Sequence, residues 1–164
     1  MRVFLGMALA LAASSISGAD RDLGTFKAWR ARAFDDDKAR VCSIWSEPSK
    51  AVGNYTRRGL IFAFVTHRTK DKALNKVSFE MGYDFKPGAR LRVKIGKQSF
   101  NLVTSRSTAW SDKRKESTAL VRAMKAGQSM VVIGVSKRGT KTTDTYSLLG
   151  FTSAHRAISK ACKF

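Results

Sequence analysis

The sequence predicts a mainly β protein: an antiparallel β-sandwich, jelly-roll-like in organisation, with one or two short helices. Apolar and polar residues alternate with a period of two over several strand-sized segments. Turn residues separate these segments, and two short stretches have the spacing of an amphipathic helix. Seven or eight strands at such intervals are typical of a sandwich or barrel.

The chain begins with a segment that has the features of a secretory signal. Met1 and Arg2 form a short basic region, and an apolar run over 3–16 and the small residues Ser17 to Ala19 follow it. The run is shorter than the roughly 20 residues that a membrane-spanning helix needs. We predict a signal peptide over residues 1–19, cleaved before Asp20, and a periplasmic or secreted product. The alternative is a buried N-terminal helix of a cytosolic protein.

The strongest strand signals lie in the middle of the chain. Residues 77–83 place four apolar side chains on one face of a strand, and residues 91–95 do the same opposite a basic face. A Pro-Gly turn at 84–88 separates them. The pair at 96–97 suits a two-residue hairpin that leads into a strand around 100–102.

Two continuous apolar runs, at 60–65 and 130–135, predict central strands that are covered on both faces. Three further segments complete the predicted strands: Trp29 to Ala31, Val41 to Trp45, and Thr143 to Leu149. No stretch after the signal peptide has membrane-spanning length, so we expect a soluble mature chain.

Two segments have helical spacing instead. Residues 117–125 place apolar side chains on one stripe, with Ser117 as a candidate N-cap and Gly127 as a terminator. Residues 152–161 predict a second short helix that ends at Cys162. The sequence therefore predicts a helix near the end of the chain that a bond through this cysteine could tie down.

The chain has two cysteines, Cys42 and Cys162. An even number of cysteines in an exported protein predicts a disulfide, which here would join the last helix to the strand that holds Cys42. Closing a loop of about 120 residues contributes on the order of 4–5 kcal/mol in the chain-entropy model. The alternative is a pair of unpaired buried thiols.

The charge of the predicted mature chain is its most unusual property. Residues 20–164 hold 30 Lys and Arg residues and all 12 acidic residues, a formal charge of +18 on 145 residues. This length predicts one domain over 20–164. So large a positive charge favours salt-dependent association with anionic surfaces. For an exported protein such surfaces are envelope or host components, and nucleic acid is not expected as a partner.

Candidate catalytic or metal-binding residues are few. His67 and His155 belong to no recognised motif, and a structural role fits them better than a catalytic one. Asp35 to Asp37 could suggest a calcium loop, but basic residues follow where oxygen ligands would be needed, so we interpret the run as a solvated turn. We expect no enzymatic activity, no cofactor and no metal.

The three tryptophans have two interpretations. Trp29, Trp45 and Trp110 could stack on bases or sugars, as aromatic residues do in single-strand binders. In a β-sandwich, tryptophans more often belong to the core, and we expect the core position for all three.

Several motifs occur in a defined order over nearly all of the predicted mature chain. They are Trp29, Val41 to Pro48, Val77 to Tyr83, Ala109-Trp110, Leu120 to Lys125, Ser136 to Thr140, Tyr146 to Phe151, and Ala157 to Cys162. In these motifs and their spacing the chain resembles the invasion-associated locus B family of exported Gram-negative envelope proteins. The resemblance implies a β-sandwich in the periplasm or at the surface and a link to host-cell invasion and virulence, and it brings no catalytic motif.

The hypothesis that follows is a non-enzymatic envelope protein with a cationic binding surface. Its partner would be an anionic envelope surface, such as lipopolysaccharide or phospholipid headgroups, or a host-surface component. The predicted anion-binding residues are Arg57, Arg58, Arg90, Arg92, Lys94, Lys113, Arg114 and Lys115. Further basic clusters lie at 68–72 and 137–138. The alternatives are a periplasmic assembly factor that binds a protein partner, and a hydrolase with a site around His67 or His155.

Overall fold

The computed structural model describes residues 20–164, so the predicted signal peptide over 1–19 lies outside the described residues. The described part holds eleven strands and two helices. In chain order they are β1 (Arg21–Phe26), β2 (Trp29–Asp36), β3 (Ala39–Ser46), β4 (Lys50–Gly53), β5 (Phe62–Arg68), β6 (Ala73–Glu80), β7 (Leu91–Ile95), β8 (Gln98–Ser105), β9 (Thr108–Trp110), α1 (Arg114–Ala126), β10 (Ser129–Val135), β11 (Lys141–Ser147) and α2 (Phe151–Cys162).

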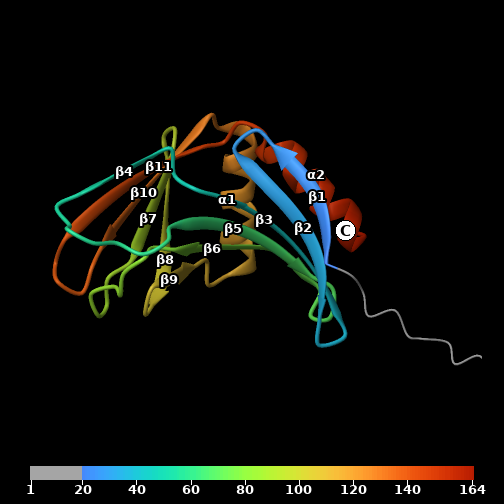
Figure 1. Ribbon diagram of the computed structural model, residues 1–164, viewed down its shortest axis with the longest axis horizontal. Coiled ribbons are helices and arrows are strands. Elements are labelled where there is room, and N and C mark those ends of the chain that lie inside the picture. Colours follow the sequence, from blue (N-terminus) through green and yellow to red (C-terminus); the bar gives the residue numbers. More distant parts are fainter. Residues whose placement is uncertain (1–19) are drawn as a thin grey trace, which may run out of the picture.

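The strands form one antiparallel sheet in the order β1-β2-β3-β5-β6-β9-β8-β7-β10-β11-β4. Strand β8 links its two halves, because residues 98–102 pair with β7 whereas residues 103–105 pair with β9. We call β1, β2, β3, β5, β6 and β9 the first half-sheet, and β7, β10, β11 and β4 the second half-sheet (Figure 1). The predicted mainly β, antiparallel fold with two short helices is confirmed.

The inner faces of the two half-sheets share one core. Phe79 of β6 packs edge-on against Tyr146 of β11, with ring centroids 6.2 Å apart. Helix α2 lies against β2 and β3, where Phe151 meets the buried Trp29 at 4.9 Å, and α1 lies against β6. Buried residues of both helices belong to this core, so the helices cover the inner face of the first half-sheet.

The C-terminal helix is joined to the first half-sheet through its last residue. The sulfur atoms of Cys42 on β3 and Cys162 at the end of α2 lie at disulfide distance, 2.09 Å apart, over a sequence separation of 120 residues. The loop thus closed includes every strand from β4 to β11 and helix α1, whereas β1 and β2 lie outside it. This is the arrangement in which a crosslink most strongly restricts the unfolded chain.

The helix-free face of the first half-sheet differs from the prediction. Side chains alternate along β5, so Val65 is buried in the core while Phe62 and Phe64 are half-buried on the opposite face, which no described helix covers. The expectation that the runs at 60–65 and 130–135 are covered on both faces is therefore wrong: both strands alternate, and Leu60, ahead of β5, is 74% exposed.

The tryptophans divide between these two faces. Trp29 is fully buried, as predicted. Trp45 is half-buried on the helix-free face and Trp110 is 37% exposed, so the core prediction is wrong for Trp110 and incomplete for Trp45. Both residues lie on strand positions that alternate away from the core.

A cationic cavity as the candidate functional site

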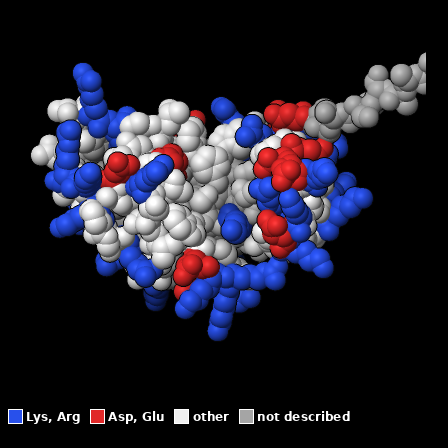
Figure 2. Space-filling view, turned by 90° about the horizontal axis from the view of Figure 1, so that it is seen from below, with Lys and Arg blue, Asp and Glu red and all other residues white. Residues whose placement is uncertain are grey.

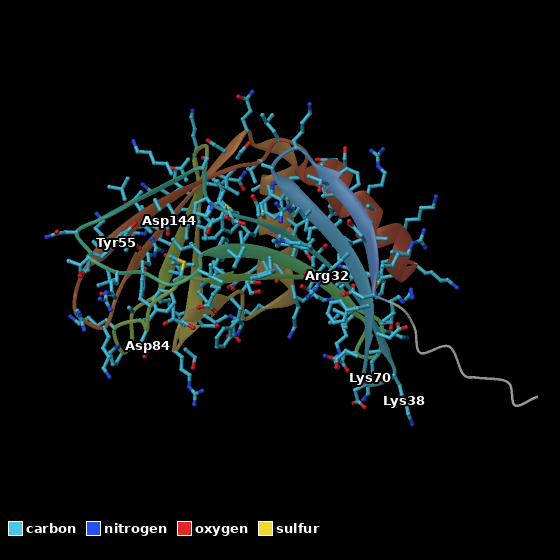
Figure 3. All side chains as sticks on the ribbon, in the orientation of Figure 1. Arg32, Lys38, Tyr55, Lys70, Asp84 and Asp144 are labelled. Atoms are coloured by element: carbon cyan, nitrogen blue, oxygen red, sulfur yellow. A yellow bond between two sulfur atoms is a disulfide. The ribbon has the colours of Figure 1, made fainter. Side chains whose placement is uncertain are left out.

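A cavity of about 550 Å³ opens at the end of the second half-sheet. Its walls come from the loop between β4 and β5, from the segment after β6, and from the turn between β10 and β11. The lining residues are Asn54, Tyr55, Thr56, Arg57, Arg58, Tyr83, Asp84, Ser136, Lys137, Arg138, Thr140 and Thr142. Tyr55 and Asp84 mark this end of the molecule in Figure 3, and Asp144 lies behind them.

Two glycines bring the first two walls together. The Gly59 amide donates to the Gly82 carbonyl at 2.9 Å. Gly82 has a positive φ of 67°, and a Cβ there would overlap the backbone of Gly59. This crossing fixes the neighbouring Arg58 and Tyr83 at the base of the cavity.

Arg58 and Asp144 form a buried ion pair below the cavity. Both terminal nitrogens of Arg58 donate to the carboxylate at 2.6 Å, and its Nε donates to the Met81 carbonyl at 2.8 Å. The Arg58 side chain is 4% exposed and that of Asp144 is fully buried. Burial alone lowers the pKa of Arg58, but the hydrogen bonds and charge of Asp144 raise it above the ordinary value.

Two tyrosines flank this guanidinium. The Arg58 guanidinium carbon lies 5.5 Å from the ring centroid of Tyr55 and 5.0 Å from that of Tyr83. The hydroxyl groups of Tyr83 and Thr142 are hydrogen-bonded at 2.7 Å. Burial raises the pKa of Tyr83, so this phenol stays neutral and keeps its proton near neutral pH.

The exposed charges around the opening are mostly positive. Arg57, Lys137 and Arg138 are exposed, and Asp84 is the acidic residue among the described lining residues. The Lys137 amide donates to the Asp84 carbonyl at 2.6 Å, which holds the β10–β11 turn against the opposite wall. Chemically, the cavity offers three exposed cationic groups together with hydroxyl groups, a combination suited to a phosphate or carboxylate.

The predicted anion-binding residues lie in three places. Arg57 lines the cavity, and Arg58 lies beneath it with its guanidinium bound to Asp144 and Met81, so Arg58 is not free to hold an external anion. Their predicted role in binding stays a prediction. The remaining six divide between strand β7 and its approach (Arg90, Arg92, Lys94) and the start of α1 (Lys113, Arg114, Lys115).

On β7, Arg92 pairs across strands with Asn101 and Lys94 with Ser99, and both side chains are exposed. At α1, Lys113 is the N-cap residue without a side-chain cap bond, and Arg114 donates to the Lys72 carbonyl at 2.7 Å. The basic cluster Lys137-Arg138 is visible in the sequence, but no sequence signal indicates that it lies beside Arg57 in space. The tyrosines of the cavity were not predicted as site residues, because Tyr83 was interpreted as an apolar strand residue and Tyr55 belongs to no motif.

His67 and His155 form a buried network instead of a catalytic pair. His67 Nδ1 accepts a hydrogen bond from the backbone N–H of Asn75 at 3.1 Å, and its Nε2 lies 3.1 Å from the Ser159 hydroxyl. His155 Nε2 lies 2.7 Å from Asn75 Oδ1. Burial lowers the pKa of both rings to about 4, with the charge of Lys125 adding to the effect. Neutral rings bonded to amide and hydroxyl groups match a structural role.

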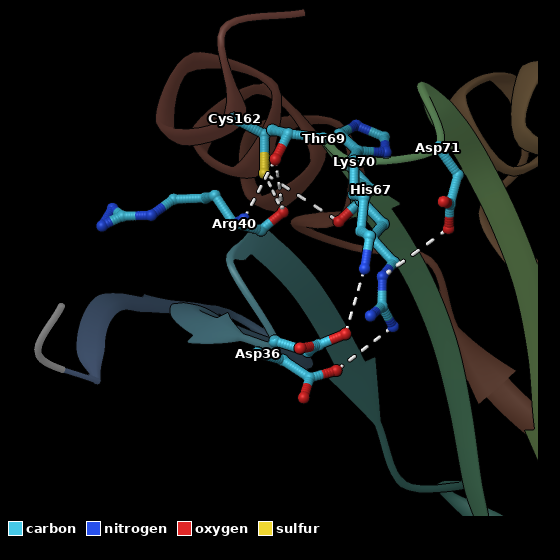
Figure 4. Close-up of polar contacts among 9 residues, drawn as sticks. Asp36, Arg40, His67, Thr69, Lys70, Asp71 and Cys162 are labelled. Atoms are coloured by element: carbon cyan, nitrogen blue, oxygen red, sulfur yellow. Dashed lines mark hydrogen bonds and ion pairs between the residues drawn. The ribbon is translucent and has the colours of Figure 1, made fainter. Parts of the chain in front are cut away.

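The acidic run at 35–37 ends β2 with Asp35 and Asp36 and begins the turn of the β2–β3 hairpin with Asp37. Asp36 lies 3.2 Å from Arg68, and Asp37 lies 3.0 Å from Lys70 (Figure 4). All three acids are exposed, in line with a solvated turn. Within residues 20–164, no cluster of His, Cys, Asp and Glu has the geometry to hold a metal ion. In the same residues, neither helix is long and apolar enough to cross a membrane.

The fold and this site define a class: a mainly β, strongly basic protein whose terminal helix is crosslinked to its sheet. The sequence model of the family described as "Invasion associated locus B (IalB) protein" matches residues 29–159. The chain belongs to this family.

A solved structure has a similar fold. The crystal structure of invasion associated protein b from Bartonella henselae matches with a TM-score of 0.57 and 14% identity, covering 85% of this chain and 97% of that one. No curated protein sequence matches the chain. At this identity the likeness supports the fold.

Proposed function

We propose that this chain is an exported, non-enzymatic envelope protein that binds an anionic surface component through the cationic cavity and the basic residues around it. The observation that carries the proposal is the charge of the cavity opening, where Arg57, Lys137 and Arg138 face one exposed acid, Asp84. The field of the whole chain strengthens attraction of an anion to this opening.

Export is the first part of the proposal. We propose that residues 1–19 are a signal peptide cleaved after Ala19, and that residues 20–164 form the single mature domain. The disulfide between Cys42 and Cys162 supports this, because such bonds persist in oxidising compartments. Mass spectrometry of the native protein should then give the mass of a chain that begins at Asp20.

A binding role fits the groups in the cavity better than a catalytic one. The carboxylate of Asp144 is neutralised by Arg58, and the histidines are hydrogen-bonded within the core. The exposed cationic groups can instead match the phosphates of lipopolysaccharide or of anionic phospholipids. A host-surface polyanion would be bound by the same groups, which would give a physical basis to the invasion link in the family's name.

The test is co-sedimentation of residues 20–164 with vesicles containing anionic phospholipid. Replacing Arg57, Lys137 and Arg138 with Gln should weaken binding about 100-fold, because each cation near an anionic surface contributes about 1 kcal/mol. The matched control replaces three exposed cations on the helices, Arg122, Arg156 and Lys160, with Gln. It changes the net charge equally and should weaken binding less than about tenfold.

Raising salt from 50 to 500 mM shortens the screening length from roughly 14 to 4 Å and should abolish binding. Vesicle binding that does not depend on salt would contradict the proposed site. Equal weakening of binding in the two triple variants would contradict it as well. A specific protein partner, captured equally well by the cavity variant, would favour the assembly role instead.

A further inference from the structure

A second binding surface lies on the helix-free face of the first half-sheet. Three adjoining hollows of about 580, 410 and 200 Å³ all include Arg32 in their linings. Trp45 lines the first and third, and Ser43 lines the second and third. Because they share these residues, the hollows form one continuous groove, which we call the Arg32 groove.

The Arg32 groove is concave because the half-sheet curves around it. Figure 3 shows Arg32 on the side of β2 that faces away from α2. Figure 2, viewed from below Figure 1, shows a hollow between two lobes of the molecule. A concave trough suits an extended polymer better than a flat bilayer.

Aromatic rings are aligned along the groove by the strand register. Arg30 of β2 pairs with Trp45 of β3, and Trp45 pairs with Phe64 of β5. Beyond the groove lining, the same row continues to Ser78 of β6 and reaches Trp110 of β9. From Trp45 to Trp110 the row crosses three strand spacings, about 15 Å. Phe62 packs beside Phe64 with ring centroids 5.7 Å apart.

These rings are accessible although they lie on a folded sheet. Trp45, Phe62 and Phe64 are half-buried and Trp110 is 37% exposed. The guanidinium carbon of Arg32 lies 4.8 Å from the centroid of Phe34 and 5.7 Å from that of Trp45, within cation–π distance of both rings. A contiguous apolar surface of this kind marks a binding site more often than chance exposure.

The charge of the groove contrasts with that of the whole chain. Its lining holds four basic and four acidic residues: Arg30, Arg32, Arg68, Lys76, Asp20, Asp22, Asp36 and Asp71. The side chains of the lining therefore carry no net formal charge, in a predicted mature chain of +18. A polyanion such as nucleic acid would gain no net attraction from this surface.

We infer that the Arg32 groove binds an uncharged polysaccharide chain. Sugar rings present C–H groups that pack on the electron-rich faces of Trp45 and Phe64. Their hydroxyl groups both donate and accept hydrogen bonds, and the mixed lining supplies carboxylates to accept and guanidinium groups to donate. The balanced charge and the concave shape both favour this partner over a lipid surface or a polyanion. The groove is independent of the cationic cavity.

The test uses residues 20–164 and neutral hexasaccharides of glucose, of N-acetylglucosamine and of mannose, with binding followed by calorimetry. At least one should bind saturably, and affinity should change less than about twofold between 50 and 500 mM salt, because no net charge is neutralised. Trp45→Ala and Arg32→Ala should each weaken binding about tenfold, and Trp45→Phe should recover most of the loss. Leu149→Ala removes an exposed apolar side chain outside the groove lining and should bind normally.

Failure of all three hexasaccharides to bind would overturn the inference. So would unchanged binding in the Arg32→Ala variant. The side chain of Arg32 is exposed, so its removal should not disturb the core. If a heparin hexasaccharide is the only sugar that binds saturably, and its binding is lost at high salt, sugar recognition belongs to the cationic surfaces instead. The cavity variant with Gln at 57, 137 and 138 should bind neutral sugars normally, so the two proposals can fail separately.

Discussion

The cationic cavity and the Arg32 groove differ in charge and in construction. The cavity combines three exposed cations with one acid and is built on a buried ion pair between Arg58 and Asp144. The groove has a balanced lining and is built on cross-strand rows of aromatic residues. The large net charge of this chain is therefore distributed unevenly, and it does not describe every surface on which a partner could bind.

The two surfaces also depend on different parts of the fold. The cavity depends on loops that the glycine crossing and the Arg58 ion pair hold together. The groove depends on the regular register of β2, β3 and β5, below which the histidine network and the disulfide lie. Local changes should therefore disturb the cavity more readily than the groove.

The largest effect should come from removing the carboxylate of the buried ion pair. Asp144→Ala leaves the Arg58 guanidinium buried without its partner and should lower the free energy of unfolding by about 3–5 kcal/mol. Denaturation in urea measures this. Asp84→Ala, an exposed acid at the cavity opening, is the control and should change stability by less than about 0.5 kcal/mol. Equal losses of stability in the two variants would contradict the claim that the cavity is built on the buried ion pair.

The next largest effect should be a loss of stability in acid, which comes from the two buried histidines of the groove-bearing half-sheet and of the helix packed on it. Burial lowers the folded-state pKa of His67 and His155 to about 4, below the ordinary 6.5, so the unfolded chain binds protons first as pH falls. Stability is then complete above pH 6.5 and is lost as the pH falls from about 6.5 to about 4. From pH 7 to pH 5.5 the loss is about 1.2 kcal/mol per histidine, or roughly 2.5 kcal/mol for both.

Urea denaturation at the two pH values tests this. A His67→Gln, His155→Gln double variant should be less stable at pH 7 but should lose much less on acidification. If the variant keeps the full acid sensitivity of the parent chain, other groups are responsible.

The smallest effect concerns the basic residues of strand β7. Charge reversal to Glu at Arg90, Arg92 and Lys94, added to the cavity variant, should weaken vesicle binding by only about a further threefold, because it acts through the general field. Neutral hexasaccharide binding should not change. A loss larger than that of the cavity variant would move the anion-binding surface from the cavity to β7.

The parts of the fold predicted from sequence are those where one face is polar. Strand β7 was located because Leu91, Val93 and Ile95 alternate with basic residues, and the structure buries all three. In β5 both faces are apolar, so the sequence could not reveal that Phe62 and Phe64 line an open groove. The short strands β1, β4 and β9 were missed, because few of their residues reach the core.

The candidate site shows the same limit. Arg57 and Arg58 are adjacent and identical, yet one lines the cavity opening and the other is buried against Asp144, 86 residues away. Only the folded sheet brings Asp144 beneath this loop. Likewise, Trp45 is separated from Phe64 in sequence, and the antiparallel register alone makes them neighbours.

The position of Asp20 in the wall of the groove links ligand access to maturation. If the leader is cut after Ala19, the peptide bond that is broken adjoins this wall, and the new α-amino group is formed beside the groove. The precursor keeps nineteen additional residues attached at that point. The first residue of the processed chain would then be a wall residue of the Arg32 groove, so the exact cleavage position would determine which groups border this surface.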